Sequence, residues 1–136
     1  DDAKLAIKNE YALHIGKTDQ DFKIAKSKLD TVGVSCYNDL DRALKMADQG
    51  ASYVSFGAFF QSPTKPNATP CPLSIISDFK KQNKSTKISA IGGINSTNAK
   101  PLIQEGANFI CICSAVWGLK TNEEKVDEIN KIFTLF

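Results

Sequence analysis

Short apolar runs and amphipathic stretches alternate along the whole chain. The apolar runs predict five buried strands, at 11–15, 31–36, 52–57, 87–91 and 108–113. The segments between and around them predict six helices, at 2–9, 21–29, 39–49, 72–82, 97–105 and 123–136. Strict alternation of strand and helix predicts a parallel sheet, in either an open doubly wound fold or a (β/α)₈ barrel.

Three of these helices have an apolar face that predicts how they pack. The expected inner residues are Phe22, Ile24, Ala25 and Leu29 in the second helix, Leu40, Ala43, Leu44 and Ala47 in the third, and Val126, Ile129, Ile132 and Phe133 in the last. Asn38 is the expected N-cap of the third helix, and Gly50 is expected just beyond its end. Gly106 is expected to end the fifth helix, which has Pro101 near its start.

The loop 58–71, after the third strand, is the strongest candidate for chemistry. It makes this interval between strands longer than the others. Ser62, Thr64 and Lys65 place two hydroxyls and one ammonium close together, and Pro63 and Pro66 restrict the backbone around them. Such groups donate hydrogen bonds to phosphate oxygens, so the loop predicts a site for an anionic ligand.

Other candidate residues also follow strands, so a parallel sheet would bring them to the same edge. Gly92 and Gly93 precede a helix and, with Ser114 on the neighbouring strand end, form a second possible phosphate cradle. Ser35 lies near the end of the second strand. Asp19 follows the first strand and could help to hold Mg²⁺ with a polyphosphate. Each has an ordinary structural alternative, since tight turns need glycine and Asp is a common helix N-cap.

Composition excludes several classes of function. The 136 residues fit a single domain, 1–136, and a net charge of +2 without a basic run predicts no nucleic-acid partner. No apolar stretch approaches the roughly 20 residues needed to span a bilayer, and the N-terminus does not resemble a signal peptide. We therefore expect a cytoplasmic protein without a membrane partner. With one histidine, His14, a zinc site is not expected, and a hydrogen-bonded structural role is the simplest one for that ring.

The four cysteines have a simple structural interpretation. Cys36, Cys71, Cys111 and Cys113 are expected to be small buried hydrophobic residues in a reducing compartment. Cys111 and Cys113 lie two residues apart in an apolar run, so they are expected on the same face of the last strand.

Five segments resemble thiamine phosphate synthases in their order and spacing. These are 14–19 (HIGKTD), 33–35 (GVS), 62–66 (SPTKP), 90–94 (AIGGI) and 114–116 (SAV). The resemblance implies a TIM (β/α)₈ barrel and a transferase of thiamine biosynthesis. That enzyme condenses 4-amino-2-methyl-5-hydroxymethylpyrimidine diphosphate with thiazole phosphate, giving thiamine phosphate and pyrophosphate. The substrates implied are therefore two small molecules.

The resemblance also implies roles for individual residues. Asp1 and Asp19 would ligate Mg²⁺, and Ser35 and Lys65 would contact the pyrimidine diphosphate and act in catalysis. The thiazole phosphate would be bound by Ser62, Pro63 and Thr64 on one side and by Gly93, Cys113 and Ser114 on the other. The implied reaction is dissociative and needs no protein nucleophile.

The sequence departs from the family pattern in its details and in its extent. Lys17 stands where the family usually has Gln, Ser62 where Thr is usual, and Cys113 where an aliphatic residue is usual. Ala58 and Gln61 stand where Pro is frequent. The family's first strands, with a Gln-x-Arg-x-Lys diphosphate-binding segment, have no counterpart in the sequence. We therefore expect a chain that supplies about the last five βα units of a barrel and that associates with the missing N-terminal segment or forms a homo-oligomer.

Two other functions remain open from the sequence. One is a thiazole tautomerase, a related enzyme that resembles the synthase in its barrel and double-glycine turn, although the loop of Ser62 to Lys65 favours the synthase. The other is a non-catalytic half-barrel that binds phosphate.

Overall fold

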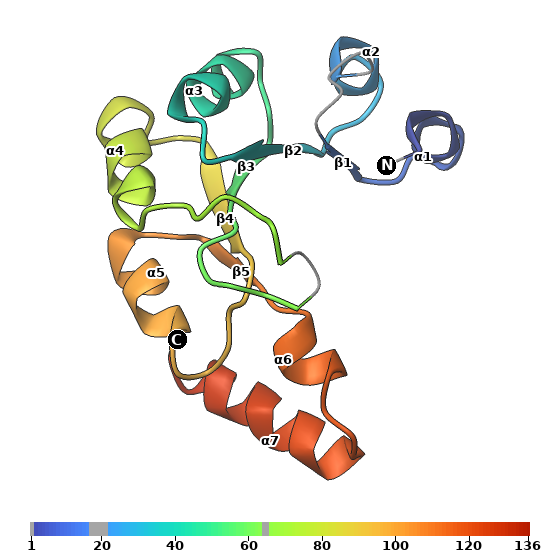
Figure 1. Cartoon of the computed structure of the whole chain (residues 1–136). Helices are drawn as coiled ribbons and strands as arrows, with labels where there is room; N and C mark the ends of the chain where they lie inside the picture. The colour runs from blue at the N-terminus through green and yellow to red at the C-terminus, as the bar shows by residue number, and fades with distance from the viewer. Residues whose placement is uncertain (1, 17–21, 64–65) are drawn as a thin grey trace.

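The computed structural model describes residues 2–16, 22–63 and 66–136, and its strands form one parallel sheet (Figure 1). The elements in chain order are α1 (Ala3–Asn9), β1 (Leu13–Ile15), α2 (Phe22–Lys26), β2 (Val32–Tyr37), α3 (Leu40–Asp48), β3 (Tyr53–Phe56), α4 (Ser74–Gln82), β4 (Lys87–Ile91), α5 (Ala99–Glu105), β5 (Phe109–Cys111), α6 (Ser114–Trp117) and α7 (Asn122–Phe133). The strands pair in sequence order, β1-β2-β3-β4-β5, and every pair is parallel. The α/β fold expected from the alternation is confirmed.

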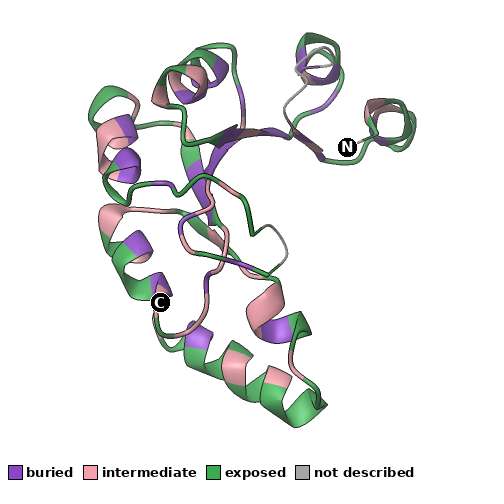
Figure 2. Cartoon of the chain, in the orientation of Figure 1, coloured by how far each residue is buried: buried purple, intermediate pink, exposed green. Residues whose placement is uncertain are grey.

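The sheet follows an arc, with helices α2 to α5 on its outer side (Figure 1). Alternate strand residues on this side are fully buried, and they are apolar. They are Val32, Val34, Cys36, Val54, Phe56, Ile88 and Ala90. The rings of Phe56 on β3 and Phe79 on α4 meet edge to face with their centroids 5.7 Å apart. Figure 2 shows the buried sides of these helices turned toward the strands. The core is therefore a layer of helices packed on one face of the sheet.

The other face of the sheet carries a different kind of residue. Because side chains alternate along a strand, the residues between the buried ones point inward, and many are polar. They include His14, Ser35, Tyr53, Ser55 and Ser89. This alternation places the apolar core outside the arc and polar side chains inside it, of which Ser55 and Ser89 are buried.

The structure corrects three details of the predicted helices. The N-cap of α3 is Asp39, whose carboxylate accepts a hydrogen bond from the backbone N–H of Arg42 at 2.8 Å. Asn38 instead donates to the carbonyl oxygen of Pro70, at 3.2 Å. Ile24, expected to face inward, is 56% exposed, because α2 is a single short turn that buries Phe22 and Ala25. Helix α4 begins at Ser74, two residues after Pro72.

The C-terminal part differs most from the prediction. Strand β5 ends at Cys111 instead of residue 113, and residues 114–117 form the unexpected short helix α6. Helix α7 begins after Thr121, which forms a capping box with Glu124. Of its expected apolar face, Ile132 is buried and the others are exposed.

Helix α5, in contrast, starts at Ala99, with Pro101 in its first turn, and ends at Gly106 as expected. Among the described residues, no helix combines the length and apolar character needed to cross a membrane.

Candidate functional site

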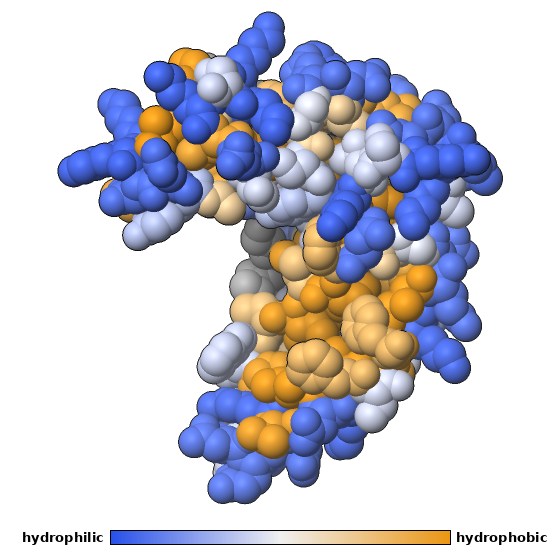
Figure 3. All heavy atoms as spheres, turned by 180° about the vertical axis from the view of Figure 1, so that it is seen from behind, coloured by the Kyte–Doolittle hydropathy of each residue, from blue (hydrophilic) through white to orange (hydrophobic). Residues whose placement is uncertain are grey.

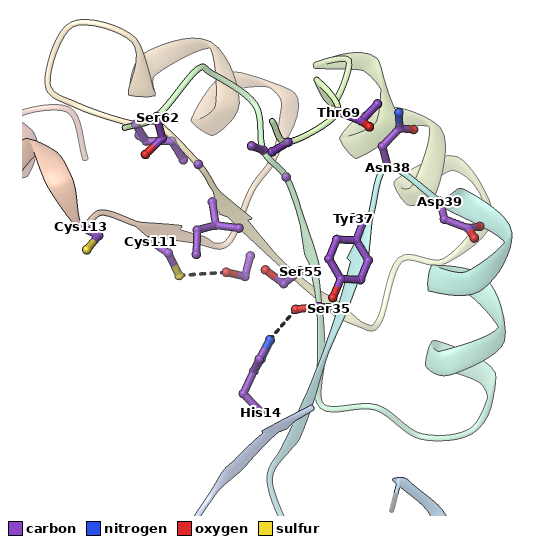
Figure 4. Close-up of a pocket in the computed structure, with 18 of the residues that line it drawn as sticks. His14, Ser35, Tyr37, Asn38, Asp39, Ser55, Ser62, Thr69, Cys111 and Cys113 are labelled. Carbon is purple, nitrogen blue, oxygen red and sulfur yellow. Dashed lines mark hydrogen bonds between the residues drawn. The ribbon is translucent and has the colours of Figure 1, made fainter. Parts of the chain in front are cut away.

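A cavity of about 1070 Å³ opens inside the arc, at the carboxyl ends of the strands (Figure 4). Its wall combines residues from β1 to β5 with the loops that follow them. Of the residues singled out in the sequence, it includes His14, Ser35, Ser62, Gly92, Gly93, Cys113 and Ser114. Segments far apart in the chain are therefore brought to one site, as expected from a parallel sheet.

The two possible phosphate cradles lie side by side. The backbone N–H of Phe59 donates to the carbonyl oxygen of Ile91 at 3.2 Å, and that of Phe60 donates to Gly92 at 3.0 Å. Gly93 has a positive φ of 64°, and a Cβ there would overlap the carbonyl oxygens of Phe60 and Gln61. Glycine is required at this position because the loop after β3 passes directly over the turn after β4.

Side chains hold the turn after β4 in place. Asn98 donates from Nδ2 to the carbonyl oxygen of Gly93 at 3.0 Å. Glu128 of α7 accepts two hydrogen bonds from Ser96, one from the backbone N–H at 2.8 Å and one from the hydroxyl at 2.9 Å. Helix α7 therefore supports the site without contacting it, because Glu128 holds the segment that carries Gly93.

His14 lies at the centre of a hydrogen-bonded group on the polar face. Its Nε2 is 2.8 Å from Ser35 Oγ, and its Nδ1 is 2.9 Å from Tyr53 Oη. Burial lowers the pKa of His14, because the imidazolium form loses solvation. Burial also raises the pKa of Tyr53. The ring is thus neutral near pH 7. The hydrogen bonds expected for it are confirmed, and the ring also belongs to the cavity wall.

Arg42 brings a positive charge to the strand ends. It donates from Nε to the carbonyl oxygen of Ser35 at 2.9 Å, and from Nη2 to that of Gly16 at 3.2 Å. Arg42 also belongs to the cavity wall. An anionic ligand near Ser35 would therefore meet a guanidinium that is already oriented by the backbone of β2 and the end of β1.

The cysteines divide into two pairs. Cys36 and Cys71 are buried as expected, and burial raises the pKa of the Cys71 thiol to about 11. Cys111 and Cys113 are exposed, contrary to expectation, because they face the cavity instead of the helices. Cys111 Sγ lies 3.1 Å from Ser89 Oγ (Figure 4). Both residues belong to the wall of the cavity. They do not share a face of β5, as was expected, because the strand ends at Cys111 and Cys113 immediately precedes α6.

The remaining predicted residues are not all brought into the cavity. Pro63 is exposed and is not among the residues that form the wall. Asp1, Asp19, Thr64 and Lys65, together with Lys17, lie outside the described residues. Within the described part of the chain, no group of three or more His, Cys, Asp or Glu side chains could hold a metal ion.

Several wall residues were missed in the sequence. They are Tyr37, Asn38, Asp39, Arg42, Tyr53, Ser55, Thr69, Ser89 and Cys111. A signal existed for the strand residues among them, since small polar residues alternate with apolar ones in β3 and β4. Arg42 gave no such signal, because its position on α3 predicts a solvent-facing side chain.

These features define an α/β protein with a cavity, lined by both polar and apolar residues, at the carboxyl ends of parallel strands. Comparison with known proteins identifies its family. The family model described as thiamine monophosphate synthase matches residues 1–116, and the chain belongs to this family. The resemblance noted in the sequence is thereby confirmed.

Curated relatives agree with this assignment. The chain is 35% identical over 124 residues to a thiamine-phosphate synthase of Nitrosospira multiformis, an alignment that covers 89% of this chain and 53% of the relative. It is 33% identical over 137 residues to that of Thioalkalivibrio sulfidiphilus, covering 98% of this chain and 64% of the relative. The chain therefore spans about half to two thirds of the length of the relatives it matches.

Solved structures show the same fold. Thiamine phosphate pyrophosphorylase from Pyrococcus furiosus superposes with a TM-score of 0.81 at 25% identity, over 99% of this chain and 64% of that one. A 3-hexulose-6-phosphate synthase superposes with a TM-score of 0.72 at 16% identity, over 98% of this chain and 66% of that one. The second likeness concerns the fold alone.

Proposed function

We propose that the chain is part of a thiamine phosphate synthase. The reaction proposed condenses 4-amino-2-methyl-5-hydroxymethylpyrimidine diphosphate with thiazole phosphate, giving thiamine phosphate and pyrophosphate. The observation that carries this proposal is the cavity wall, where Ser35, Ser62, Gly93 and Ser114 come together in a protein of this family. The volume of about 1070 Å³ suits two small substrates bound side by side.

The fold proposed is a TIM (β/α)₈ barrel, to which residues 1–136 contribute about the last five βα units. The arc of five parallel strands in sequence order, with helices on its outer side, supports this arrangement (Figure 1). So does the extent of the match, because the chain covers 53% and 64% of two curated relatives. The remaining units would come from an N-terminal segment, or their place would be taken by a second copy of the chain.

The residues are proposed to bind the diphosphate of one substrate and the phosphate of the other. Ser35 and Lys65 would contact the pyrimidine diphosphate. Ser62, Pro63 and Thr64 would line the thiazole phosphate site from one side. Gly93, Cys113 and Ser114 would bind it from the other, mostly through backbone N–H groups. Of these residues, Pro63, Thr64 and Lys65 are proposed from the family resemblance alone.

The chemistry proposed is a substitution at the pyrimidine methylene carbon. The bond from this carbon to the diphosphate oxygen breaks, and its electron pair leaves with pyrophosphate. The thiazole nitrogen then donates its lone pair to the cationic carbon. The residues proposed here bind and orient both substrates and stabilise negative charge on the leaving group, so no protein nucleophile is required.

Mg²⁺ is proposed as the cofactor, with Asp1 and Asp19 as its ligands. Carboxylate oxygens are donors that this ion prefers, and bound Mg²⁺ would neutralise charge on the diphosphate. Because both residues lie outside the described part of the chain, this proposal rests on the family resemblance. A cytoplasmic location is also proposed, as expected from the sequence.

The test is formation of thiamine phosphate from the two phosphorylated precursors with Mg²⁺. It should be run on the purified chain and on the chain joined to the N-terminal units of a curated relative. We expect activity in the joined protein at least. A joined protein that folds but forms no thiamine phosphate would contradict the proposal. Isomerisation of thiazole phosphate without any pyrimidine substrate would instead favour the tautomerase, and phosphate binding without either reaction would favour a binding half-barrel.

Lys65 is the residue whose loss should matter most for this reaction. In whichever protein forms thiamine phosphate, the chain alone or the joined protein, Lys65→Ala should lower turnover about tenfold or more. This is the usual effect of removing an electrostatic stabiliser. The matched control is Lys100→Ala, on the exposed side of α5, which should leave turnover unchanged. Equal turnover in the Lys65 and Lys100 variants would remove Lys65 from the proposed mechanism.

A further inference from the structure

Three neighbouring strands place a serine, a histidine and a tyrosine in one hydrogen-bonded chain. In the sheet, His14 pairs with Gly33, and Gly33 pairs with Tyr53. A Cβ on Gly33 would overlap the ring of Tyr53. The bare backbone of Gly33 thus lets the tyrosine ring lie across β2, stacked on His14 with the ring centroids 5.6 Å apart and the planes inclined by 23°.

The donors and acceptors in the hydrogen bonds that join Tyr53, His14 and Ser35 can be assigned in only two ways. A neutral imidazole has one N–H donor and one acceptor nitrogen, whereas each hydroxyl can do either. In the first arrangement, Tyr53 donates to Nδ1 of His14, and Nε2–H donates to Ser35, whose own proton stays free. In the second, Ser35 donates to Nε2, Nδ1–H donates to Tyr53, and the tyrosine proton stays free.

We propose that Tyr53 and His14 are positioning residues that hold His14 as the Nε2–H tautomer and leave the hydroxyl proton of Ser35 free to donate to an anionic oxygen of a ligand in the cavity. The identity of that ligand as a diphosphate rests on the function proposed above. Figure 4 shows the Ser35 hydroxyl at the cavity wall, with its hydrogen bond to His14.

Two physical reasons favour this arrangement. A phenol, with a usual pKa of about 10, is a stronger hydrogen-bond donor than an aliphatic hydroxyl. Tyr53 is therefore a better donor to the imidazole than Ser35 is. Hydrogen bonds that run in one direction also polarise each other, and here they run from Tyr53 through His14 to Ser35. The series ends at the hydroxyl of Ser35. Because its oxygen already accepts the N–H of His14, the hydroxyl proton becomes a better hydrogen-bond donor.

The surroundings of Ser35 fit an anionic acceptor. Arg42 holds the carbonyl oxygen of Ser35 at 2.9 Å and adds positive charge to the same wall. Burial keeps His14 neutral near pH 7 by lowering its pKa, so one tautomer can be selected. The free donor of Ser35 then faces the cavity beside a cation.

The tautomer can be measured directly, because His14 is the only histidine in the chain. Nitrogen-15 NMR of the ring at pH 7 separates the two arrangements. We expect a protonated Nε2 and an unprotonated Nδ1. In Tyr53→Phe the donor to Nδ1 is lost, Ser35 can donate to Nε2, and the signal should move toward the Nδ1–H form. Ser35→Ala is the control, because Tyr53 still donates and the tautomer should stay Nε2–H.

Three outcomes would overturn the inference. They are a wild-type ring in the Nδ1–H form, a doubly protonated ring at pH 7, and a Tyr53→Phe variant with an unchanged tautomer. None of these readouts depends on the identity of the substrate, so they decide the inference even if the proposed function fails.

A titration with inorganic pyrophosphate tests the link to the ligand, and it is run on the chain joined to the N-terminal units of a curated relative, which restore the diphosphate-binding segment. Ser35→Ala should weaken binding about tenfold, the scale of one hydrogen bond to a charged group. Tyr53→Phe should weaken it less, and adding Tyr53→Phe to Ser35→Ala should cost nothing more. Additive losses would contradict a role for Tyr53 that acts through Ser35. A joined protein that does not bind pyrophosphate would contradict the proposed function, whereas the tautomer would still decide this inference.

Discussion

The centre of the sheet and its C-terminal end are covered very differently. In β2, β3 and β4, residues such as Val34, Phe56 and Ile88 are 0% exposed. In β5 and the helices after it, Phe109 is 44% exposed and Trp117 and Phe133 are each 73% exposed. Figure 3 shows apolar surface gathered on the lower half of the molecule when it is seen from behind. The apolar residues of the two regions are therefore covered to very different degrees.

The difference teaches how much each unit depends on its neighbours. A central strand has a strand on both sides and helices over its outer face, so its apolar residues have partners. Strand β5 is an edge strand, and α7 buries only Ile132 of its expected apolar face. In the proposed barrel, the next units would lie beside β5 and α7. The exposed apolar surface is then the part of the core that further units would complete.

Two phenylalanines give the sharpest test of this comparison. Phe79→Ala, in α4, should lower the free energy of unfolding by about 3–5 kcal/mol, because it leaves a cavity beneath Phe56. Phe133→Ala, in α7, should change it by no more than about 0.5 kcal/mol. Urea denaturation of the purified chain measures both. A loss of several kcal/mol in the Phe133 variant would mean that this face is covered in solution.

Two glycines test how tightly the central sheet is packed. Gly33→Ala should cost about 1–3 kcal/mol, because its methyl group would overlap the ring of Tyr53 and displace it from His14. Gly16→Ala is the matched control, since no described atom lies within 4 Å of a Cβ placed there. Thermal unfolding of the two variants gives the comparison. Equal stability would show that the tyrosine ring moves aside without cost.

The central region is also where the sequence predicted most. Strand β4 has the bounds expected for it, because its apolar run is sharply bounded. The meeting of Ser35, Ser62 and Gly93 could also be predicted, since parallel strands carry their carboxyl ends to one edge. These predictions needed only periodicity and topology.

What could not be predicted depended on local geometry or on long side chains. Asn38 and Asp39 are both good N-caps, and only the observed backbone of Asp39, with φ −118° and ψ 100°, decides between them. Helix α6 spans only 114–117, too short to show a periodic pattern. The direction of the Arg42 guanidinium, back toward Ser35 and Gly16, depends on backbone carbonyls that no sequence pattern marks.

Glu128 connects the two regions, so its loss tests whether they are coupled. Glu128→Gln should cost about 1 kcal/mol, because an amide cannot accept both hydrogen bonds from Ser96 with the strength of a carboxylate. Hydrogen exchange should rise at the N–H of Ser96 and in the turn that carries Gly93. The exposed Asp127→Asn, one position earlier on α7, is the control and should change neither. Equal exchange in both variants would mean that α7 does not hold the turn.

The smallest effect expected is a pH dependence from β1, the other edge of the sheet. Burial lowers the pKa of His14 in the folded chain below its usual value of about 6.5. Between these two values, the unfolded chain binds more protons than the folded chain. Stability should therefore be highest above about pH 6.5 and should fall as the pH drops toward the folded pKa.

Replacing the titrating ring isolates this contribution. Urea midpoints measured from pH 7.5 down to about pH 5, above the usual range of carboxylates, should fall in the wild type and fall less steeply in His14→Gln. The difference should be small, because the ring is half-buried and sits in an edge strand. Parallel curves for the two proteins would mean that His14 titrates alike in the folded and unfolded chains. The polar face of β1 would then be open to water, in contrast to the buried centre of the sheet.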